Sequence, residues 1–455
     1  MKRTSSKFRR GRRRWLAAAT IALAVVIAAG CGGPSNSGGG GGGGAGSEGT
    51  IHVGTLFPTS GTVAAAGTDM LNGWKLWWKL HGNKVAGRTI QSTQEDTAGD
   101  PNTALTKARK LVQQNQVAVT VGPLLANEGY AVAGYLKENP NVVGLNPVAS
   151  SDDLSQRKRV KNFVRAGGWQ SSTPAQVAGA WAATQGWKRV ATLCTDYAFG
   201  YENCGGFTNT FTDHGGKVVK QLYAPLGTSD YSSYLAQIDP KSVDAVFVTS
   251  VGADAPKFIK AWSELGLKGK VPLITNETTL EQSTLRGIKN NDPVGLESFA
   301  HYAEGRPSPA TRQFVAAYEK AYGQMPSYYA CATYTSAQWL STAIAKLHGD
   351  LGDTDKFIKT LNGVKLKDSC FGPVSLDSYG GTVQNVYLRK VQRTEDGKLV
   401  NEVLKTYPNV SQFYNYKPAA FLQQPVYSRD YQGTDWPKNC GAYVRDCPLP
   451  GGPAQ

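Results

Sequence analysis

The segment Val117-Ala118-Val119-Thr120-Val121-Gly122-Pro123-Leu124-Leu125-Ala126-Asn127-Glu128 decides the fold class of this 455-residue chain. It is a short β-branched run that ends at Gly-Pro, and a helical pattern follows it through Tyr130, Ala133 and Leu136. That order is typical of a buried parallel strand leading into a helix. In α/β proteins ligands bind at such loops, because the helix start offers N–H groups to an anion. The segment predicts an α/β sheet and one wall of a small-molecule site, although an ordinary strand-to-helix turn fits it equally well.

The strand-loop-helix pattern repeats along most of the chain. The strands expected from it are 51–57, 89–96, 117–121, 141–145 and 162–165, then 189–193, 217–222, 245–249 and 271–275. Long helices are expected over 309–322 and 334–347, late strands over 372–376 and 383–391, and an irregular tail from Tyr414. Such alternation gives mostly parallel sheets with helices on both faces. Its restart after residue 170 predicts two consecutive doubly wound, Rossmann-like lobes, in keeping with the length of the chain.

The N-terminus has the pattern of an export signal. Eight of the positive charges behind the net +15 lie in the first fourteen residues, and without them the charge is +7. The apolar stretch 16–29 is short for a transmembrane helix, so residues 1–30 are expected to be a signal peptide. Whether the route is Sec or twin-arginine stays open, since Arg12-Arg13-Arg14-Trp15-Leu16 only weakly matches the latter. The remaining charge is scattered, which favours a solvated surface over nucleic-acid binding.

Cys31 follows Ala28-Ala29-Gly30, an order that resembles a bacterial lipobox, with Ala28 in place of the usual large aliphatic residue. We therefore expect Cys31 to be lipidated, with a plain cleaved signal as the alternative. Residues 31–50 are nearly all Gly and Ser beyond that cysteine and are expected to form a flexible tether to the membrane.

The cysteine count also indicates an exported protein. The chain has seven cysteines, and the six other than Cys31 are an even number, which suits disulfides in an oxidising compartment. No His lies near them and no Cys-x-x-Cys occurs, so a metal site is not expected. The expected pairs are the local ones, Cys194–Cys204 and Cys440–Cys447, and the remaining one, Cys331–Cys370.

With these features the chain resembles the type I solute-binding proteins of ABC transporters, in the leucine/isoleucine/valine-binding branch. The resemblance covers roughly residues 51–407. Its marks are Pro58-Thr59-Ser60-Gly61, Asn72-Gly73, Glu95-Asp96, Asp100-Pro101, Gly122-Pro123, Tyr197-Ala198-Phe199-Gly200, Phe314 to Tyr318, Tyr322 to Pro326 and Gly372-Pro373-Val374.

The resemblance implies the type I periplasmic binding protein fold, with two lobes that close on a ligand about a three-segment hinge. Lobe 1 would be 51–169 plus 300–382, and lobe 2 would be 170–299 plus 383–415. The crossings would fall near Gly167 to Trp169, Phe299 and Gly381, and residues 416–455 would be a C-terminal extension. The family also implies a monomer that delivers its ligand to an ABC permease, although a ligand-sensing lipoprotein would have the same fold.

Ligand positions carry over from the family one at a time. Ala126 stands where amino-acid-binding members place a serine hydroxyl, and the next residue, Asn127, is a candidate substitute. Phe199 replaces a tyrosine, and Glu277 matches the carboxylate that meets the ligand's ammonium. The full set of expected ligand-binding residues is Ser60, Ala126, Asn127, Val148, Ser150, Phe199, Gly252 and Glu277.

The sequence is compatible with two classes of ligand. The retained Glu277 favours an amino acid or an amino-acid-like amide, our first expectation, unless it is only a loop acid or a helix cap. Phe199, Trp169 and the small residues Ala126 and Gly252 favour an aromatic or other small organic acid instead. Ser150 has the alternative of a plain loop serine.

An enzyme is not expected. Gly-x-Ser-x-Gly, His-Glu-x-x-His and the phosphate-loop motif are all missing from the sequence, and its five histidines are isolated. The glycine run 38–44 precedes no helical pattern. We therefore expect no catalytic residues, no cofactor and no metal, and a protein that captures a small ligand outside the cytoplasm.

Overall fold

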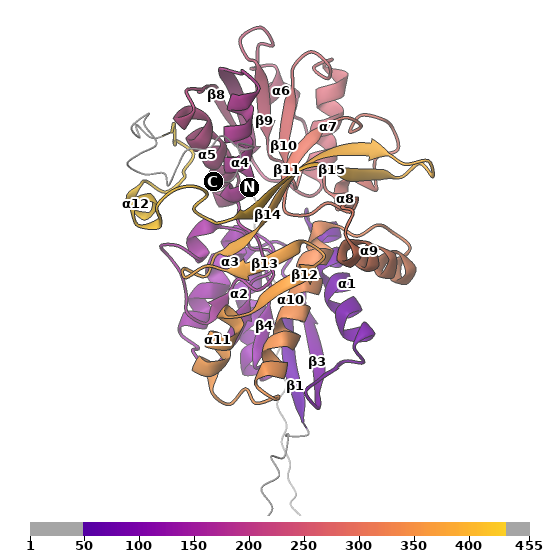
Figure 1. The fold of residues 1–455 in the computed structure, drawn as a ribbon, viewed down its shortest axis with the longest axis vertical. Helices are drawn as coiled ribbons and strands as arrows, with labels where there is room; N and C mark the ends of the chain where they lie inside the picture. Colours follow the sequence, from indigo (N-terminus) through magenta and orange to yellow (C-terminus); the bar gives the residue numbers. More distant parts are fainter. Residues whose placement is uncertain (1–48, 434–455) are drawn as a thin grey trace, which may run out of the picture. The chain divides into compact units, whose positions relative to one another are not determined.

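The computed structural model describes residues 49–433 (Figure 1). The expected signal peptide 1–30, the lipidated Cys31, nearly all of the tether and the pair Cys440–Cys447 lie outside the described residues.

The first sheet has six strands in the order β2-β3-β1-β4-β5-β6. β4, from the segment quoted first, pairs in parallel with β1 and with β5, and its three residues are fully buried. Only β2 runs antiparallel, against β3. The strands are β1 (Thr50–Leu56), β2 (Lys84–Val85), β3 (Arg88–Glu95), β4 (Val119–Val121), β5 (Val143–Leu145) and β6 (Phe163–Val164).

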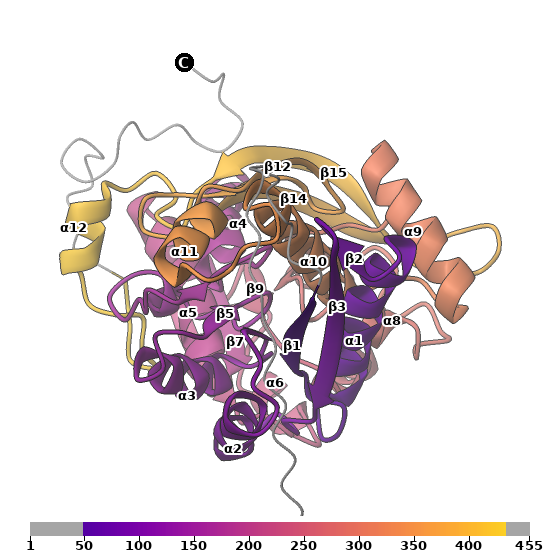
Figure 2. The same cartoon turned by 90° about the horizontal axis from the view of Figure 1, so that it is seen from below.

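Helices cover both faces of this sheet. α2 (Pro101–Gln113) and α3 (Ala126–Lys137) bury their apolar side chains against one face. The other face packs against helices from both ends of the chain, as Figure 2 shows, namely α1 (Ala64–Leu80), α9 (Pro309–Tyr322), α10 (Tyr328–Lys346) and α11 (Thr354–Asn362). α2 begins as the sequence predicts, because Asp100 Oδ1 accepts the Thr103 N–H at 2.7 Å and proline fills the first turn.

The second sheet has nine strands. Parallel pairing runs in the order β8-β7-β9-β10-β11, and the antiparallel strands β14, β13 and β12 continue from β11, with β15 also paired to β14. The strands are β7 (Arg189–Thr195), β8 (Lys217–Ala224), β9 (Ala245–Val248), β10 (Leu273–Asn276), β11 (Glu297–Ala300), β12 (Lys365–Ser369), β13 (Gly372–Leu376), β14 (Thr382–Arg393) and β15 (Leu399–Val410).

This sheet is also covered on both faces. α4 (Ser172–Thr184) and α5 (Ala198–Asp213) pack on one face. α6 (Ser232–Leu235), α7 (Asp254–Glu264) and α8 (Gln282–Leu285) pack on the other. We call the first sheet with its helices and the β12–β13 hairpin the first half, because Leu366, Phe371 and Val374 pack in the same core as α1 and α10. The rest of the second sheet with its helices is the second half. The prediction of a mixed α/β fold with two mostly parallel sheets is confirmed.

Some local predictions were wrong. The tail from Tyr414 is not wholly irregular, because α12 (Pro418–Gln423) lies in it, with Phe421 buried. α10 begins at Tyr328, earlier than the expected 334, because Ser327 Oγ accepts the Ala330 N–H at 3.3 Å and caps an aromatic first turn. The strand β15 was not expected, since its outward positions carry charged residues.

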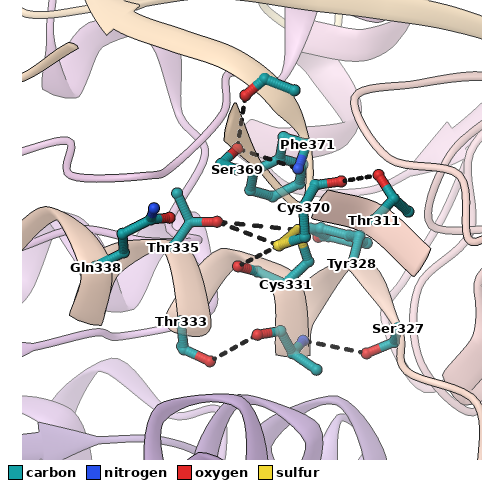
Figure 3. The surroundings of a disulfide bond; sticks show 12 residues. Thr311, Ser327, Tyr328, Cys331, Thr333, Thr335, Gln338, Ser369, Cys370 and Phe371 are labelled. Carbon is teal, nitrogen blue, oxygen red and sulfur yellow. Dashed lines mark hydrogen bonds between the residues drawn. A yellow bond between two sulfur atoms is a disulfide. The ribbon is translucent and has the colours of Figure 1, made fainter. Parts of the chain in front are cut away.

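Two expected disulfides are present, Cys194–Cys204 and Cys331–Cys370, with Cα–Cα distances of 6.2 and 5.9 Å. The second joins the first turns of α10 to the β12–β13 connection (Figure 3). Thr311 of α9 donates to the carbonyl of Cys370 at 3.0 Å, so three elements meet there. Among residues 49–433, no helix has the length and apolar character needed to span a membrane.

Candidate functional site

A cavity lies where strand ends of both halves meet, and its open space of about 10 Å³ is room for about one water molecule. The cavity is therefore nearly closed in this arrangement. The strands β4, β5, β7, β9 and β10 all point their carboxyl ends at it, as is usual for α/β binding sites. Its walls are Leu124, Leu125, Ala126, Val148, Ser150, Trp169, Tyr197, Phe199, Val251, Thr278, Tyr328 and Tyr329.

The loop from β4 to α3 forms one wall. Gly122 has φ +114°, and a Cβ there would come within 2.3 Å of the Leu56 carbonyl oxygen, so only glycine fits. The chain then turns into α3, whose first turn has N–H groups with no acceptor in the helix itself. Glu128 Oε2 accepts the Leu125 N–H at 2.8 Å, and Ala126 leaves its methyl group in the cavity wall.

Glu128 was not expected at the site from sequence. It is fully buried, and burial raises the pKa of its carboxyl to about 7. Hydrogen bonds from the backbone of Leu124 and Leu125 and from Thr97 oppose that rise. At neutral pH this carboxyl is therefore partly protonated. The start of α3 then carries less negative charge than it would with a fully ionised Glu128.

The loop after β5 forms a second wall and is held rigidly. The Ser150 hydroxyl accepts from Ser171 Oγ at 3.0 Å, and the Ser150 carbonyl accepts the Ser171 N–H at 3.0 Å. Arg165, almost fully buried, donates to the carbonyl oxygens of Ala149 and Trp169 at 3.0 and 2.8 Å. Ser150 is thus a hydroxyl fixed at the cavity surface, able to donate its own proton to a ligand anion.

Aromatic rings make up much of the remaining wall. Trp169 is central: its ring centroid lies 5.2 Å from that of Tyr328 and 5.8 Å from that of Phe199, both in edge-to-face geometry. Tyr197 lies 5.9 Å from Phe199, and Tyr328 lies 4.0 Å from Tyr329. Aromatic walls of this kind favour a flat ring, because edge-to-face and offset contacts stabilise ring pairs.

Glu277 lies at the end of β10 as expected, but the neighbouring Thr278 is the residue that reaches the cavity wall. The Glu277 Oε2 atom accepts the His301 N–H at 2.5 Å, and the Glu277 carbonyl oxygen accepts a hydrogen bond from Arg389 Nη2 at 2.8 Å. Burial raises the pKa of the Glu277 carboxyl to about 7, and the nearby Arg389 opposes the shift. Within the described residues Glu277 Oε1 has no hydrogen-bond partner.

Four of the eight expected residues line this cavity together: Ala126, Val148, Ser150 and Phe199. The other four do not reach its wall. Ser60 is exposed and hydrogen-bonds Asp96, and the exposed Asn127 accepts the Glu128 N–H at 3.2 Å. At Gly252 a Cβ would meet the Thr62 carbonyl oxygen at 2.6 Å, so the two halves touch there and no side chain fits.

Several wall residues were missed from sequence. Val251 and Thr278 line the cavity next to Gly252 and Glu277, the positions that the family resemblance gave. Tyr328 and Tyr329 start a helix that no strand precedes, and no local pattern distinguishes them from core aromatics. The described residues contain no cluster of His, Cys, Asp and Glu that could hold a metal ion.

Comparison with known proteins agrees with this geometry. Residues 50–398 match the model of a family described as periplasmic binding protein. The chain belongs to the periplasmic binding protein family. Its relative in Brucella melitensis, Leu/Ile/Val-binding protein homolog 6, is 30% identical over 365 residues, which are 78% of this chain and 91% of the relative.

Solved structures of similar binding proteins include two from Rhodopseudomonas palustris. The solute-binding protein of strain BisB5, in complex with 3,4-dihydroxybenzoic acid, is 29% identical to this chain and has a TM-score of 0.75. The match covers 79% of this chain and 98% of that protein. The protein of strain HaA2, in complex with p-hydroxybenzoic acid, is also 29% identical, with a TM-score of 0.74 and coverage of 79% and 97%.

This binding protein is accordingly an extracytoplasmic solute-binding protein of the ABC transporter class. Its family captures small molecules and works with ABC permeases, and it is not a family of enzymes.

Proposed function

We propose that this binding protein captures a small aromatic carboxylic acid between two closing lobes and delivers it to an ABC importer. The observation that carries the proposal is the cavity wall itself, in which Trp169, Tyr197, Phe199, Tyr328 and Tyr329 surround the space at the strand ends. Two similar binding proteins hold hydroxylated benzoic acids, which supports the same class of ligand here.

The carboxylate of the ligand would lie at the start of α3. There the N–H groups of the first helical turn and the Ser150 hydroxyl are available donors, and the helix dipole favours an anion. Ala126 has no hydroxyl group to bind the carboxylate. Backbone N–H groups would therefore have to make the contact that a serine side chain would make at this position.

The lobes would be residues 51–169 with 300–382 and residues 170–299 with 383–415. In support, β6 ends in the first sheet at Val164 and α4 packs on the second from Ser172. β11 pairs in the second sheet, whereas α9 packs against α1. Hinge crossings near residues 167–169, 299 and 381 would then let the halves separate, admit the ligand and close again.

An amino acid or amide is the second candidate, and Glu277 favours it. Its unpartnered Oε1 is an acceptor one residue behind the cavity wall, and its charge acts on the cavity residues Tyr328 and Tyr329. A ligand ammonium would need this carboxyl to turn towards the cavity. Because Oε2 and the main chain of Glu277 are already bound to His301 and Arg389, the aromatic acid is our first choice.

A thermal-shift screen tests the choice, since a ligand that binds only the folded state raises the melting temperature. Benzoic acid, 4-hydroxybenzoic acid, leucine, isoleucine and asparagine form a sufficient panel. We expect a rise with the aromatic acids and none with the amino acids; the reverse pattern would overturn the proposed ligand class.

We also propose that the mature chain is a monomeric lipoprotein. Cleavage before Cys31 and lipidation of that residue would leave the Gly-rich segment 31–50 as a tether to the membrane. Replacing Cys31 by Ala should release the protein from the membrane fraction of the cells that express it; retention there would contradict the lipid anchor.

A further inference from the structure

Glu202 and Asp152 meet where the two halves touch beside the ligand cavity. Glu202 lies on α5 of the second half, and Asp152 lies in the loop after β5 of the first. Ser151 Oγ donates to Glu202 Oε1 at 2.5 Å, and the Asp152 N–H donates to Glu202 Oε2 at 3.1 Å. Both carboxyl side chains are almost fully buried, at 3% and 4% exposure. The contact therefore places two acids together in a site that is largely shielded from solvent.

The surrounding groups do not neutralise two negative charges. Arg165, at the end of β6, is the buried cation nearby, and its guanidinium donates to the carbonyls of Ala149, Ser151 and Trp169. Arg157 pairs with Asp153 at 2.9 Å instead.

The other neighbouring polar groups are neutral, distant or like-charged. From α3, Tyr130 shares a hydrogen bond with Ser151, and Lys158 lies over its ring. From α4, the Ser172 N–H donates to Asp152 Oδ1 at 3.4 Å. Asp377 is a further negative charge that interacts with Arg165. Burial, together with the charge of Asp152, raises the pKa of the Tyr427 hydroxyl. Asp152 Oδ2 has no hydrogen-bond partner in the described part of the chain.

Burial raises the pKa of Asp152 to about 6, although Ser172 and Arg165 oppose the shift. Burial and the charge of Asp152 hold the pKa of Glu202 well above its usual value, although hydrogen bonds from Ser151 and Ser171 oppose that rise. Because the groups interact, the proton belongs to the pair rather than to either residue. In the closed arrangement the pair therefore holds a proton more tightly than two ordinary carboxyls would.

The C-terminal segment covers the outer side of this contact. Phe421, Pro425, Val426 and Tyr427 line a small cavity together with Asp152, Glu202 and Arg157. Arg157 of the first half donates to the carbonyls of Phe421, Leu422 and Gln424, while Gln176 of the second half donates to the Tyr427 hydroxyl. Separation of the halves would therefore break the Ser151–Glu202 contact, expose both acids to water and restore their ordinary acidity.

We propose that Glu202 couples closure of the two halves to the uptake of one proton, so that ligand affinity falls as the pH rises. Glu202 acts as a positioning residue, because it contacts the opposite half and not the ligand cavity. The inference rests on the proposed lobe movement, and not on the identity of the ligand. Between the ordinary pKa of these carboxyls in the open form and their raised pKa in the closed form, the closed form binds more protons, so by linkage the affinity should decrease by up to about tenfold per pH unit over that interval and level off above it.

Calorimetric titration with 4-hydroxybenzoic acid tests the coupling. Titrations at one neutral pH in phosphate and in Tris, which differ in ionisation enthalpy, report the number of protons taken up with the ligand. We expect about one more proton for the wild type than for Glu202→Gln, and a pH-dependent affinity only in the wild type. The matched control Glu264→Gln, at an exposed acid of α7, should behave as the wild type. Equal proton numbers and equal pH slopes in wild type and Glu202→Gln would overturn the proposal.

Two further measurements keep the test decisive. If Glu202→Gln does not fold, Asp152→Asn removes the same pair from the other side and should also abolish the proton uptake. If 4-hydroxybenzoic acid binds no variant, the proposed ligand class fails, and the coupling is read from X-ray scattering of the unliganded protein. The wild type should then become reversibly more compact as the pH is lowered through mild acid, and Glu202→Gln should not; identical scattering profiles at all pH values would contradict the coupling.

Discussion

Arg286 Nη2 donates to Asp69 Oδ2 at 2.8 Å and thereby joins α8 of the second half to α1 of the first. Asp69 is fully buried and also accepts from the Tyr318 hydroxyl at 3.0 Å, while Arg286 Nη1 donates to the Met325 carbonyl at 3.0 Å. The bridge is a second polar contact between the halves, separate from that of Glu202, and it can form only when they are together.

Asp69→Asn should therefore weaken ligand binding without touching the cavity. A hydrogen bond to a charged partner contributes about 1.5–3 kcal/mol, so we expect roughly a 10- to 100-fold loss of affinity in calorimetric titration. Glu264→Gln, which removes an exposed ion pair within α7, serves as the control and should leave affinity unchanged. Wild-type affinity in Asp69→Asn would show that the bridge does not stabilise the closed form.

Ser150→Ala tests the anion contact. The hydroxyl lies in the cavity wall and already accepts from Ser171, so its own proton is free for a ligand carboxylate. Its loss should cost about 1 kcal/mol, or roughly fivefold in affinity. Ser233→Ala, at an exposed position of α6, is the comparison and should have no effect. An unchanged affinity in Ser150→Ala would leave the hydroxyl as a purely structural group.

The Cys331–Cys370 disulfide should contribute more to stability than Cys194–Cys204, because it closes 39 rather than 10 residues of sequence. In the loop-entropy model, replacing both cysteines by Ser should lower the free energy of unfolding by about 4 kcal/mol for the first pair and about 3 kcal/mol for the second. Denaturant unfolding of the two double variants measures the difference. The reverse order would mean that strain or residual structure, and not loop closure, dominates.

Arg157→Met should loosen the C-terminal segment. The guanidinium binds three carbonyls around α12 at 3.0–3.2 Å, and Met keeps the apolar stem but none of these hydrogen bonds. We expect faster limited proteolysis near residues 416–433, followed by mass spectrometry. Lys161→Met, at an exposed residue of the same loop that pairs with Asp355, should be cleaved at the wild-type rate. Equal rates for both variants would mean that Arg157 does not hold the segment.

Glu128 predicts a pH dependence of stability. Its pKa is raised to about 7 in the folded protein, against about 4.3 when unfolded. Between these values the folded state binds more protons, so the stability that this group contributes falls as the pH rises from about 4.3 to about 7. Melting temperatures of Glu128→Gln should therefore decline less over that interval than those of the wild type. Glu138→Gln, on the exposed end of the same helix, should keep the wild-type profile, and identical profiles for all three proteins would contradict the shift.

Sequence patterns located most of the fold because buried parallel strands and capped helices are local signals. The bounds of α9 were predicted to the residue, since Ser308 caps it, Pro309 starts it and Gly323 ends it in a left-handed conformation. The family resemblance gave Ala126, Val148, Ser150 and Phe199 as ligand positions, and in the structure these four residues from different parts of the chain line one cavity.

What sequence could not supply depends on tertiary contacts. Tyr328 and Tyr329 reach the cavity because α10 returns to α1 and is tied to the β12–β13 connection by Cys331. Glu277 looks like a ligand carboxylate from its place after β10, yet the structure directs its Oε2 to the backbone of His301. α12 is helical because Phe421 packs among Phe413 and Tyr416, which no local propensity indicates.

Isothermal titration of the whole protein with 4-hydroxybenzoic acid and with leucine separates the two ligand classes. We expect saturable binding of one molecule of the aromatic acid per chain, a marked loss of affinity in Phe199→Ala, and no heat with leucine. Saturable binding of leucine with no binding of the aromatic acid would contradict this expectation.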